Sequence, residues 1–379
     1  MKLTVSKQLL SEAIQNVSKA ISGKSPLPIL NGIKIDADSA GMTLTASDTE
    51  ISIKAFIPPQ EEEETTIQLI EPGSVVLPAK FFTEIIKKLP SNQVEIEVSS
   101  LFQTVIRSGS SEIQMIGLDP EEYPELPTVE NKQTISLSSD LLKQLIHQTT
   151  FAVSTNETTP ILTGVLWMIR DGQFKWVACD RHRLAQAETP MQLSGEALPQ
   201  IVIAGKTLNE LAKIIPDQNI LVEIVLSDNQ VLFKLDRLLF FSRILDGTYP
   251  DTSKLIPDRF QTEIIVNTKE LADAIDRAYL LSREEKTNIV RLVMNEDQTI
   301  EISSGSSELG NLKETIRLES ISGELLKIAF NSKYMLDALK VMDSDTIKIG
   351  FTGSMSPIII KPNDGSSQLQ LILPYRTVN

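Results

Sequence analysis

Cysteine and histidine are scarce in this sequence of 379 residues, which contains Cys179 as its one cysteine and His147 and His182 as its histidines. A lone cysteine excludes an internal disulfide and suits a reducing compartment. A zinc site built from Cys and His also fails on numbers, because one cysteine and two histidines fall short of the usual four ligands and His147 lies far from the other two in sequence. We therefore expect no metal and no cofactor.

Long apolar runs are missing as well. No stretch approaches the roughly 20 apolar residues of a membrane span, and residues 1–15 lack the continuous apolar segment of a signal peptide. Basic residues are outnumbered by acidic ones, and the formal net charge is −14. Taken alone, this net charge argues against nucleic acid as a partner. The composition predicts a cytoplasmic protein that does not associate with membranes.

Familiar catalytic motifs are absent too: neither common glycine-rich phosphate loop occurs, nor does Gly-x-Ser-x-Gly. The most enzyme-like segment is ACDRHRLA at residues 178–185, where Cys179 and His182 are the residue types of a nucleophile and its base. The segment follows the run QFKWV and reads as an extended strand, in which residues three apart point to opposite faces. This interpretation predicts that the two side chains do not pair and that the chain is not an enzyme.

What the sequence does contain is a unit that occurs three times. Residues 135–166 read as strand, helix, loop and a second extended run that opens at Pro160, and Ser138 stands where a helix N-cap belongs. Similar segments start near residues 3 and 263, and Pro28-Ile29-Leu30 recurs 132 residues later as Pro160-Ile161-Leu162. Asn267 takes the capping place of Ser138 in the third segment. A period this long indicates a duplicated domain rather than a solenoid repeat.

A second repeated unit places a lysine at the start of a helix. Lys80, Lys206 and Lys333 each follow a short β-type run and precede apolar residues at helical spacing, and they are separated by 126 and 127 residues. Three domains of about 125 residues fit the usual size range. We therefore predict an α+β fold of three tandem copies, at residues 1–126, 127–256 and 257–379, each with two helices and about eight strands.

The charge is unevenly distributed between these helices and the rest of the chain. The six predicted helical stretches sum to +5, whereas the remaining residues carry −19. Helices that shared one face would offer phosphates a mildly basic lining inside an acidic shell. Ordinary lysines on solvated helix faces explain the same numbers, so the charge distribution leaves both interpretations open.

The three copies, the two Pro-Ile-Leu turns, HRLA at 182–185 and LPYR at 373–376 together resemble the bacterial sliding clamp family, the beta subunit of DNA polymerase III holoenzyme. The resemblance covers the whole chain. It implies a homodimeric ring, closed head to tail, in which helices line a hole that holds duplex DNA. Such a clamp is a processivity factor without catalytic activity, and a weakly basic lining leaves it free to slide.

The resemblance also implies site residues. Family DNA contacts correspond to Lys24, Lys80, Asn156 and Lys206. Ring closure corresponds to Ile113 and Met115 on one side and to Leu280 and Leu281 on the other.

A pocket between the second and third copies is expected to receive short apolar-aromatic peptides from the replicative polymerase, the clamp loader and repair proteins. Its residues correspond to Leu162, Cys179, Arg181, His182, Arg183, Leu184, Pro250, Lys254, Leu255, Met355, Leu373, Pro374, Tyr375 and Arg376. Arg181 replaces a usual small residue, and Thr159 and Lys254 stand where arginines are frequent. Such an arginine would narrow or recharge the pocket mouth. We expect Arg181→Gly to open the mouth, so that peptide affinity rises or stays level but does not fall.

Two alternatives stay open at this point. One is a paralogous clamp that forms the same ring and serves mainly repair or other partners, which the departures at Thr159, Arg181 and Lys254 leave room for. The other is an enzyme that uses the segment from Cys179 to Arg183.

Overall fold

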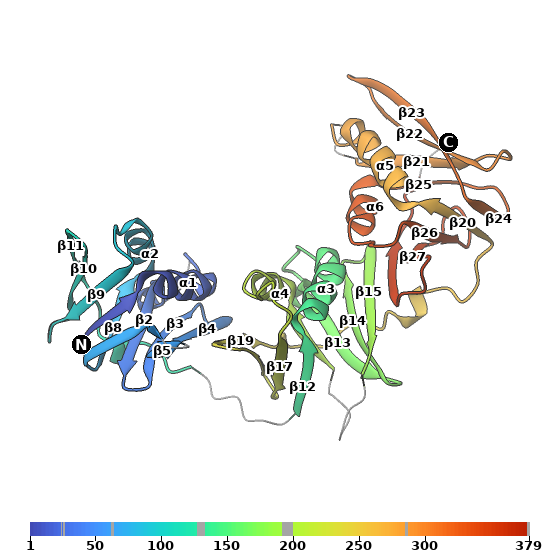
Figure 1. The fold of residues 1–379 in the computed structure, drawn as a ribbon. Helices are drawn as coiled ribbons and strands as arrows, with labels where there is room; N and C mark the ends of the chain where they lie inside the picture. Colours follow the sequence, from blue (N-terminus) through green and yellow to red (C-terminus); the bar gives the residue numbers. More distant parts are fainter. Residues whose placement is uncertain are drawn as a thin grey trace. The chain divides into compact units, whose positions relative to one another are not determined.

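The computed structural model describes residues 1–23, 25, 27–61, 64–126, 133–191, 200–284 and 287–376. Figure 1 labels the helices and strands of the chain. By its internal contacts the chain divides into two compact units. Unit 1 combines residues 1–142 with 210–244, and unit 2 combines residues 143–209 with 245–379. Lys24 lies outside the described residues. At the predicted boundary between residues 126 and 127, residue 126 is described and residue 127 is not. The middle copy is thus shared between the two units.

Unit 1 contains a five-stranded and an eight-stranded antiparallel sheet. The first has the order β11 (Ser111–Ile116), β10 (Gln103–Ser108), β9 (Gln93–Val98), β1 (Lys2–Ser6) and β7 (Ile67–Glu71). The second has the order β12 (Gln133–Ser138), β17 (Leu221–Leu226), β18 (Gln230–Leu235), β19 (Leu238–Arg243), β4 (Ile51–Ile57), β3 (Gly41–Ser47), β2 (Gly32–Asp38) and β8 (Gly73–Pro78). A short hairpin, β5 (Gln60–Glu61) with β6 (Glu64–Thr65), stands apart.

Unit 2 contains a nine-stranded and a four-stranded antiparallel sheet. The larger has the order β16 (Ile201–Ala204), β13 (Gly164–Arg170), β14 (Gln173–Cys179), β15 (Arg183–Pro190), β28 (Gln368–Ile372), β27 (Ile358–Pro362), β26 (Thr346–Phe351), β20 (Thr262–Asn267) and β24 (Ser320–Gly323). The smaller has the order β23 (Gly310–Arg317), β22 (Thr299–Ser306), β21 (Ile289–Met294) and β25 (Lys327–Asn331).

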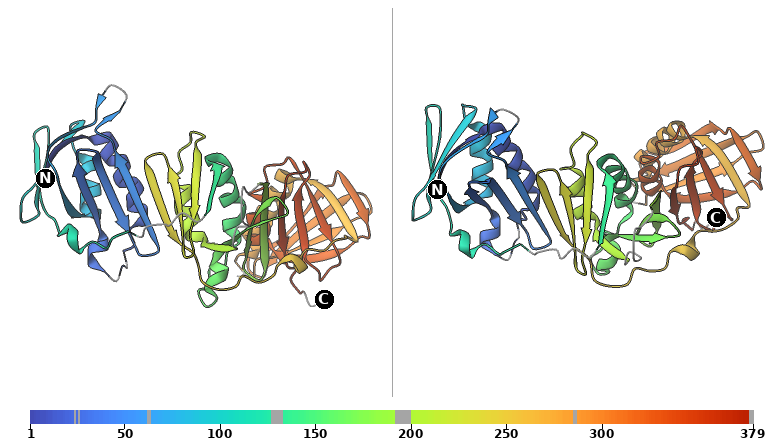
Figure 2. Two further views of the ribbon diagram at one scale, coloured as in Figure 1. Left: turned by 90° about the horizontal axis from the view of Figure 1, so that it is seen from below. Right: turned by 60° about the horizontal axis from the view of Figure 1, so that its bottom comes forward.

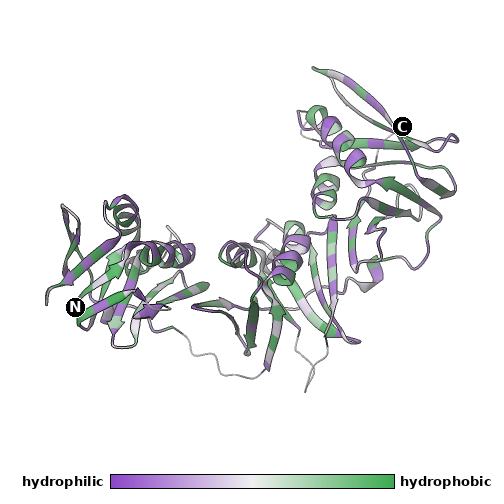
Figure 3. Cartoon of the chain, in the orientation of Figure 1, coloured by the Kyte–Doolittle hydropathy of each residue, from purple (hydrophilic) through white to green (hydrophobic). Residues whose placement is uncertain are grey.

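Six α-helices occur in the described part of the chain, two in each copy as predicted. They are α1 (Lys7–Val17), α2 (Ala79–Lys88), α3 (Ser139–Thr149), α4 (Gly205–Ala212), α5 (Thr268–Ser282) and α6 (Ser332–Leu339). Helices α1 and α2 pack side by side, as do α5 and α6, and each pair lies against strands of its own unit (Figures 1 and 2). Every helix carries both hydrophobic and hydrophilic residues (Figure 3), so its apolar side faces the core.

The predicted helix starts are confirmed. Ser138 Oγ accepts a hydrogen bond from the Leu141 N–H at 3.3 Å, and Asn267 Oδ1 accepts one from the Glu270 N–H at 2.9 Å. The lysines at 80, 206 and 333 are each the second residue of their helix and are exposed. The side-chain caps satisfy backbone donors that have no partner within the helix.

Two local predictions are wrong. Pro160 does not open an extended run but starts a 3-10 turn, η5 (Pro160–Thr163), in which the Leu162 N–H bonds to the Thr159 carbonyl at 3.1 Å. Proline's fixed φ suits the first position of such a turn as well as it suits a strand. Residues 180–182 are not extended either, because they form the tight turn of the β14–β15 hairpin.

Strands of different copies pair at two places, which we call the internal seams. The first seam joins β4 to β19 in unit 1, with Ile51 opposite Ser242. The second seam joins β15 to β28 in unit 2, with Arg183 opposite Ile372. Each seam merges the sheet of one copy with the last strand of the next, so neighbouring copies share a continuous hydrogen-bonded sheet.

Candidate binding surfaces

The β14–β15 hairpin positions the most polar cluster of unit 2. Asp180 Oδ1 accepts hydrogen bonds from the backbone N–H groups of His182 and Arg183 at 2.9 and 3.0 Å, which closes the turn. Arg181 then adopts a left-handed conformation with φ of 76°, uncommon for a residue that has a Cβ. The residues before and after this turn, Cys179 and Leu184, are a cross-strand pair.

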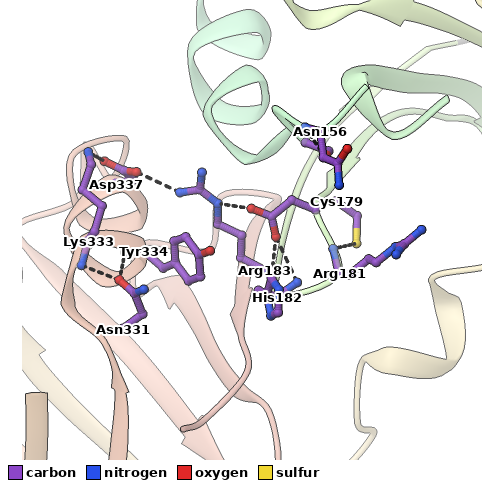
Figure 4. Close-up of polar contacts among 11 residues, drawn as sticks. Asn156, Cys179, Arg181, His182, Arg183, Asn331, Lys333, Tyr334 and Asp337 are labelled. Carbon is purple, nitrogen blue, oxygen red and sulfur yellow. Dashed lines mark hydrogen bonds and ion pairs between the residues drawn. The ribbon is translucent and has the colours of Figure 1, made fainter. Parts of the chain in front are cut away.

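Arg183 connects this hairpin to α6 (Figure 4). Its Nε donates to Asp180 at 2.9 Å and its Nη1 donates to Asp337 at 2.8 Å, and its side chain is only 12% exposed. The guanidinium also lies over the rings of Tyr334 and Phe151, at 4.6 and 5.5 Å from their centroids. A planar cation held by two carboxylates and two aromatic faces fixes α6 against the hairpin.

Beside the hairpin lies an open cavity of about 300 Å³. It brings together Leu162, Arg181, His182 and Arg183, all predicted for the peptide pocket, with Asn156, which was predicted for DNA. The full lining consists of Val153, Ser154, Thr155, Asn156, Thr159, Leu162, Asp180, Arg181, His182, Arg183 and Tyr334. His182 is stacked on Tyr334 with ring centroids 6.2 Å apart.

The predicted apolar wall is part of a buried cluster. Leu162, Cys179 and Leu184 pack with Tyr249 and Leu371 in it, and all five are at most 8% exposed. Burial raises the pKa of the Cys179 thiol, so the thiolate that a nucleophile needs is disfavoured. This counts against an enzyme that uses Cys179.

The other predicted pocket residues lie on exposed loops and at the chain's end. Leu255, Met355, Leu373 and Tyr375 are large apolar side chains with 38–52% exposure. Pro250, Lys254 and Arg376 are exposed and Pro374 is half-buried. The C-terminal segment is tied down at Leu373, whose N–H donates to the His182 carbonyl at 2.8 Å, which brings it to the hairpin.

Sequence reasoning missed Tyr334, Asp337, Phe151 and Leu371. Asp337 accepts a hydrogen bond from Arg183, which lies 154 residues away in the sequence. A local sequence pattern does not predict a contact between residues so far apart. Tyr334 follows the recurring lysine Lys333, so the repeated unit located its helix but gave no sign of its role.

The predicted ring-closure residues are placed as follows. Ile113 and Met115 are half-buried on β11, the edge strand of the five-stranded sheet, and the adjacent Ile116 is 77% exposed. Leu280 is 49% exposed near the end of α5, and Leu281 is half-buried.

Of the predicted DNA contacts, Lys80, Lys206 and Asn156 are exposed, and Lys24 lies outside the described residues. In the described ranges no cluster of His, Cys, Asp and Glu is arranged to hold a metal ion. No described helix is long and apolar enough to cross a membrane.

Comparison with known proteins gives three consecutive family matches. The models of the DNA polymerase III beta subunit match as N-terminal domain at residues 1–127, central domain at 136–251 and C-terminal domain at 253–376. The beta sliding clamps of Bacillus subtilis and Staphylococcus aureus are 50% and 45% identical over 377 residues, with 100% of both chains covered in each case.

Solved structures agree with these relatives. The DNA polymerase sliding clamp from Bacillus subtilis superposes with a TM-score of 0.97 at 49% identity and full coverage of both chains. The DNA polymerase III beta chain from Streptococcus pneumoniae has a TM-score of 0.95 at 35% identity, with 99% of this chain and 100% of that chain covered.

These matches confirm the resemblance drawn from the sequence and the α+β fold of three tandem clamp domains. They support the replication clamp over the paralogue and make the chain a non-catalytic subunit rather than an enzyme. The chain belongs to the DNA polymerase III beta subunit family, the beta sliding clamps.

Proposed function

We propose that two copies of this chain close head to tail into a ring around duplex DNA and that the cavity beside the β14–β15 hairpin belongs to a pocket for partner peptides. The domains are assigned to residues 1–126, 127–256 and 257–379, and the site of action to the cytoplasm. The observation that carries the ring is that both internal seams use equivalent strands in the same register. Among the residues that the structure describes, this leaves one pair of equivalent edges unpaired.

The equivalence follows from counting through the strand ladders of each copy. The residues before the first helix of each copy, Ser6, Ser138 and Asn267, are taken as equivalent. Following the paired residues from strand to strand, from these starting points to the last strand of each copy, gives the same position in that strand to Met115, Ser242 and Ile372, which are therefore equivalent. Counting from the residue before each second helix (Pro78, Ala204 and Asn331) makes a second set equivalent: Ile51, Arg183 and Gly310.

At both internal seams one residue of the second set stands opposite one of the first: Ile51 opposite Ser242, and Arg183 opposite Ile372. The remaining pair is Gly310 on β23 and Met115 on β11, and both strands are edges of their sheets. We assign the subunit interface to these two strands, β23 of one chain and β11 of the other, because an unpaired edge is a template for another strand.

The register predicts complementary neighbours across the interface. Leu312 stands opposite Ile113, and both are half-buried in the single chain. Lys313 stands opposite Glu112, so one step along the strands opposite charges face each other. Leu280 and Leu281 supply further apolar area from α5, which packs against β23.

A disulfide trap tests this register. Ile113→Cys combined with Leu312→Cys is expected to give a covalent dimer on mild oxidation, because the two Cβ atoms come within bonding range. Ile113→Cys combined with Asn311→Cys is the matched control, since a one-residue shift points the side chain to the other face. The native Cys179 is buried and does not compete. Equal cross-linking of both variants, or a monomer in native mass measurement, overturns the interface.

For DNA we assign Lys24, Lys80, Lys206 and Asn156 to the lining of the hole. In the described part of the chain no acidic side chain is paired with Lys80 or Lys206. Lys333, the third lysine of the series, donates to Asp337 at 2.5 Å, which removes it from this set. Few phosphate contacts mean a small counterion-release term, so a ring that encloses DNA slides instead of gripping it.

Charge reversal of Lys24, Lys80 and Lys206 tests the lining. We expect faster loss of the variant from nicked circular DNA at moderate salt, with the dimer intact. Unchanged retention contradicts the assignment.

For partners we assign the pocket residues named from the sequence, together with Tyr334. Short peptides with Leu and Phe anchors, from the polymerase, the clamp loader and repair proteins, would place these anchors against Leu162, Leu184 and Leu373. Concave apolar sites with a few polar groups at their rim are common binding places. Titration of a labelled polymerase tail peptide tests this assignment directly.

A further inference from the structure

Arg181 is the unusual residue of the cavity beside the β14–β15 hairpin. It holds a left-handed conformation, with φ of 76°, that costs a residue with a Cβ roughly 1 kcal/mol. Its guanidinium does not turn back to Asp180 in its own turn. Instead Nη2 donates to Thr159 Oγ1 at 2.8 Å, so the side chain is held by the loop that precedes η5.

The cationic side chains around the cavity differ in whether a carboxylate is paired with them. Arg183 is held between Asp180 and Asp337, and Lys333 is paired with Asp337. Arg181 has a neutral hydroxyl as its hydrogen-bond partner, and no carboxylate lies within ion-pair distance of it among the described residues. Figure 4 shows its side chain pointing away from Arg183 and Asp337. The cavity therefore carries one positioned guanidinium whose charge is not offset.

We propose that Arg181 is a specificity residue that selects peptides with an aspartate or glutamate beside their apolar anchors. The inference rests on the proposed peptide pocket and adds the chemistry of its ligand. Thr159 positions the guanidinium at the cavity, and an incoming carboxylate accepts from the donors of Arg181 that Thr159 leaves free. A guanidinium has five N–H donors in a planar fork that matches a carboxylate.

The test uses two labelled peptides that share Leu and Phe anchors and differ only in Asp or Asn next to them. Wild type is expected to prefer the Asp peptide by about fivefold at low salt, the upper range for an exposed ion pair. Arg181→Gln removes the charge at nearly the same length and should abolish the preference, while Arg181→Lys keeps part of it. Thr159→Val should lower the preference without abolishing it, because the charge stays but is less well positioned.

Two controls separate charge recognition from shape. Arg291→Gln changes an exposed arginine on β21 and should leave the preference intact. Arg181→Gly should leave the affinity of the Asn peptide level or raise it, because the side chain is removed from the mouth. It should lower the affinity of the Asp peptide, which departs from the expectation drawn from the sequence that no peptide affinity falls. Raising the salt concentration should shrink the preference of wild type alone.

Three results overturn the proposal. An equal loss of both peptides in Arg181→Gln gives the residue a structural role. A preference that survives Arg181→Gln places the recognition elsewhere. Unchanged peptide binding with faster loss of the variant from nicked circular DNA shows that the cation serves phosphates. If wild type binds neither peptide, the peptide pocket itself fails and this inference fails with it, a result distinct from the other three.

Discussion

The two internal seams share one backbone and differ in side-chain chemistry. In each hairpin an aspartate, Asp48 or Asp180, accepts two backbone N–H groups across the turn. The next residue is left-handed in both, with φ of 81° at Thr49 and 76° at Arg181. After the first hairpin, the chain also contains a buried tyrosine, Tyr123, which lies 74 residues beyond Thr49 in the sequence. The turn is therefore set by the aspartate and the strand pairing, which leaves the other positions free to change.

The side chains that flank the turn show what changed. In the first hairpin Ser47 and Ser52 are buried and their hydroxyls lie 2.7 Å apart. In the second hairpin Cys179 and Leu184 occupy the equivalent pair of positions and are buried without such a bond. The two serine hydroxyls hydrogen-bond to each other and form a polar surface that apolar side chains of a ligand contact poorly. The Cys179 sulfur and the Leu184 side chain form an apolar surface instead. The comparison favours the second hairpin over the first as the place for the proposed peptide pocket.

The seams also differ in how firmly they are closed. At the second seam Arg183 holds Asp337, and the buried amides of Gln368 and Gln370 donate to the carbonyls of Val341 and Gln148. At the first seam an open groove of about 930 Å³ runs beside α1, β4 and residues 213–221. Its rim carries the Arg237–Glu61 ion pair at 2.9 Å. The same strand pairing is thus reinforced by buried polar contacts at one seam and is open to water at the other.

The largest expected effect concerns the proposed third seam, between chains. Leu280→Asp with Leu281→Asp is expected to give a folded monomer, because burying unpaired charge at an interface costs on the order of several kcal/mol. Leu325→Asp is the matched control, since Leu325 is about as exposed as Leu280, at 46% against 49%. Sedimentation at nanomolar concentration is the measurement, and a surviving dimer of the double variant rejects this interface.

The next effect separates the two internal seams. Arg183→Ala leaves the carboxylates of Asp180 and Asp337 without their shared cation, so we expect a loss of about 3 kcal/mol. The transition of unit 2 should shift by roughly 5–10 °C in calorimetry. Adding Asp337→Asn should recover part of the loss, and Arg291→Ala should cost little. No shift in Arg183→Ala would mean that the ion pairs add nothing to the second seam.

A smaller effect is expected at the proposed pocket. Met355→Ala with Leu373→Ala and Tyr375→Ala removes three exposed apolar side chains and should weaken a polymerase tail peptide by about 2 kcal/mol, roughly 30-fold. Ring formation should persist, because none of the three lies on β11, β23 or α5. Leu101→Ala, which truncates a side chain 77% exposed in unit 1, should leave the affinity unchanged. Equal affinity of wild type and the triple variant places the pocket elsewhere.

The sequence predicts those parts of this molecule whose causes are local. Ser138 and Asn267 are found as caps because a cap acts on the N–H three residues ahead. The left-handed turn at Arg181 is hidden, because its signal would have been Gly or Asn and the position holds arginine. The contact of Arg183 with Asp337, and with it the role of Tyr334, depends on which strand edges meet, and strand order is not written in any segment of sequence.

The smallest effect compares the buried thiol of the second hairpin with the hydroxyl of the first. Burial raises the pKa of the Cys179 thiol, so the folded state holds this proton more tightly than the unfolded chain does. The resulting stabilisation is fully present below the ordinary thiol pKa and is lost as pH rises through the raised folded value. Cys179→Ser, which restores the residue found at Ser47, cannot titrate in this range. Between about pH 8 and 10 the free energy of unfolding of unit 2 should therefore fall more in wild type than in Cys179→Ser. Parallel pH profiles of the two proteins would show that this thiol titrates alike in the folded and unfolded chains.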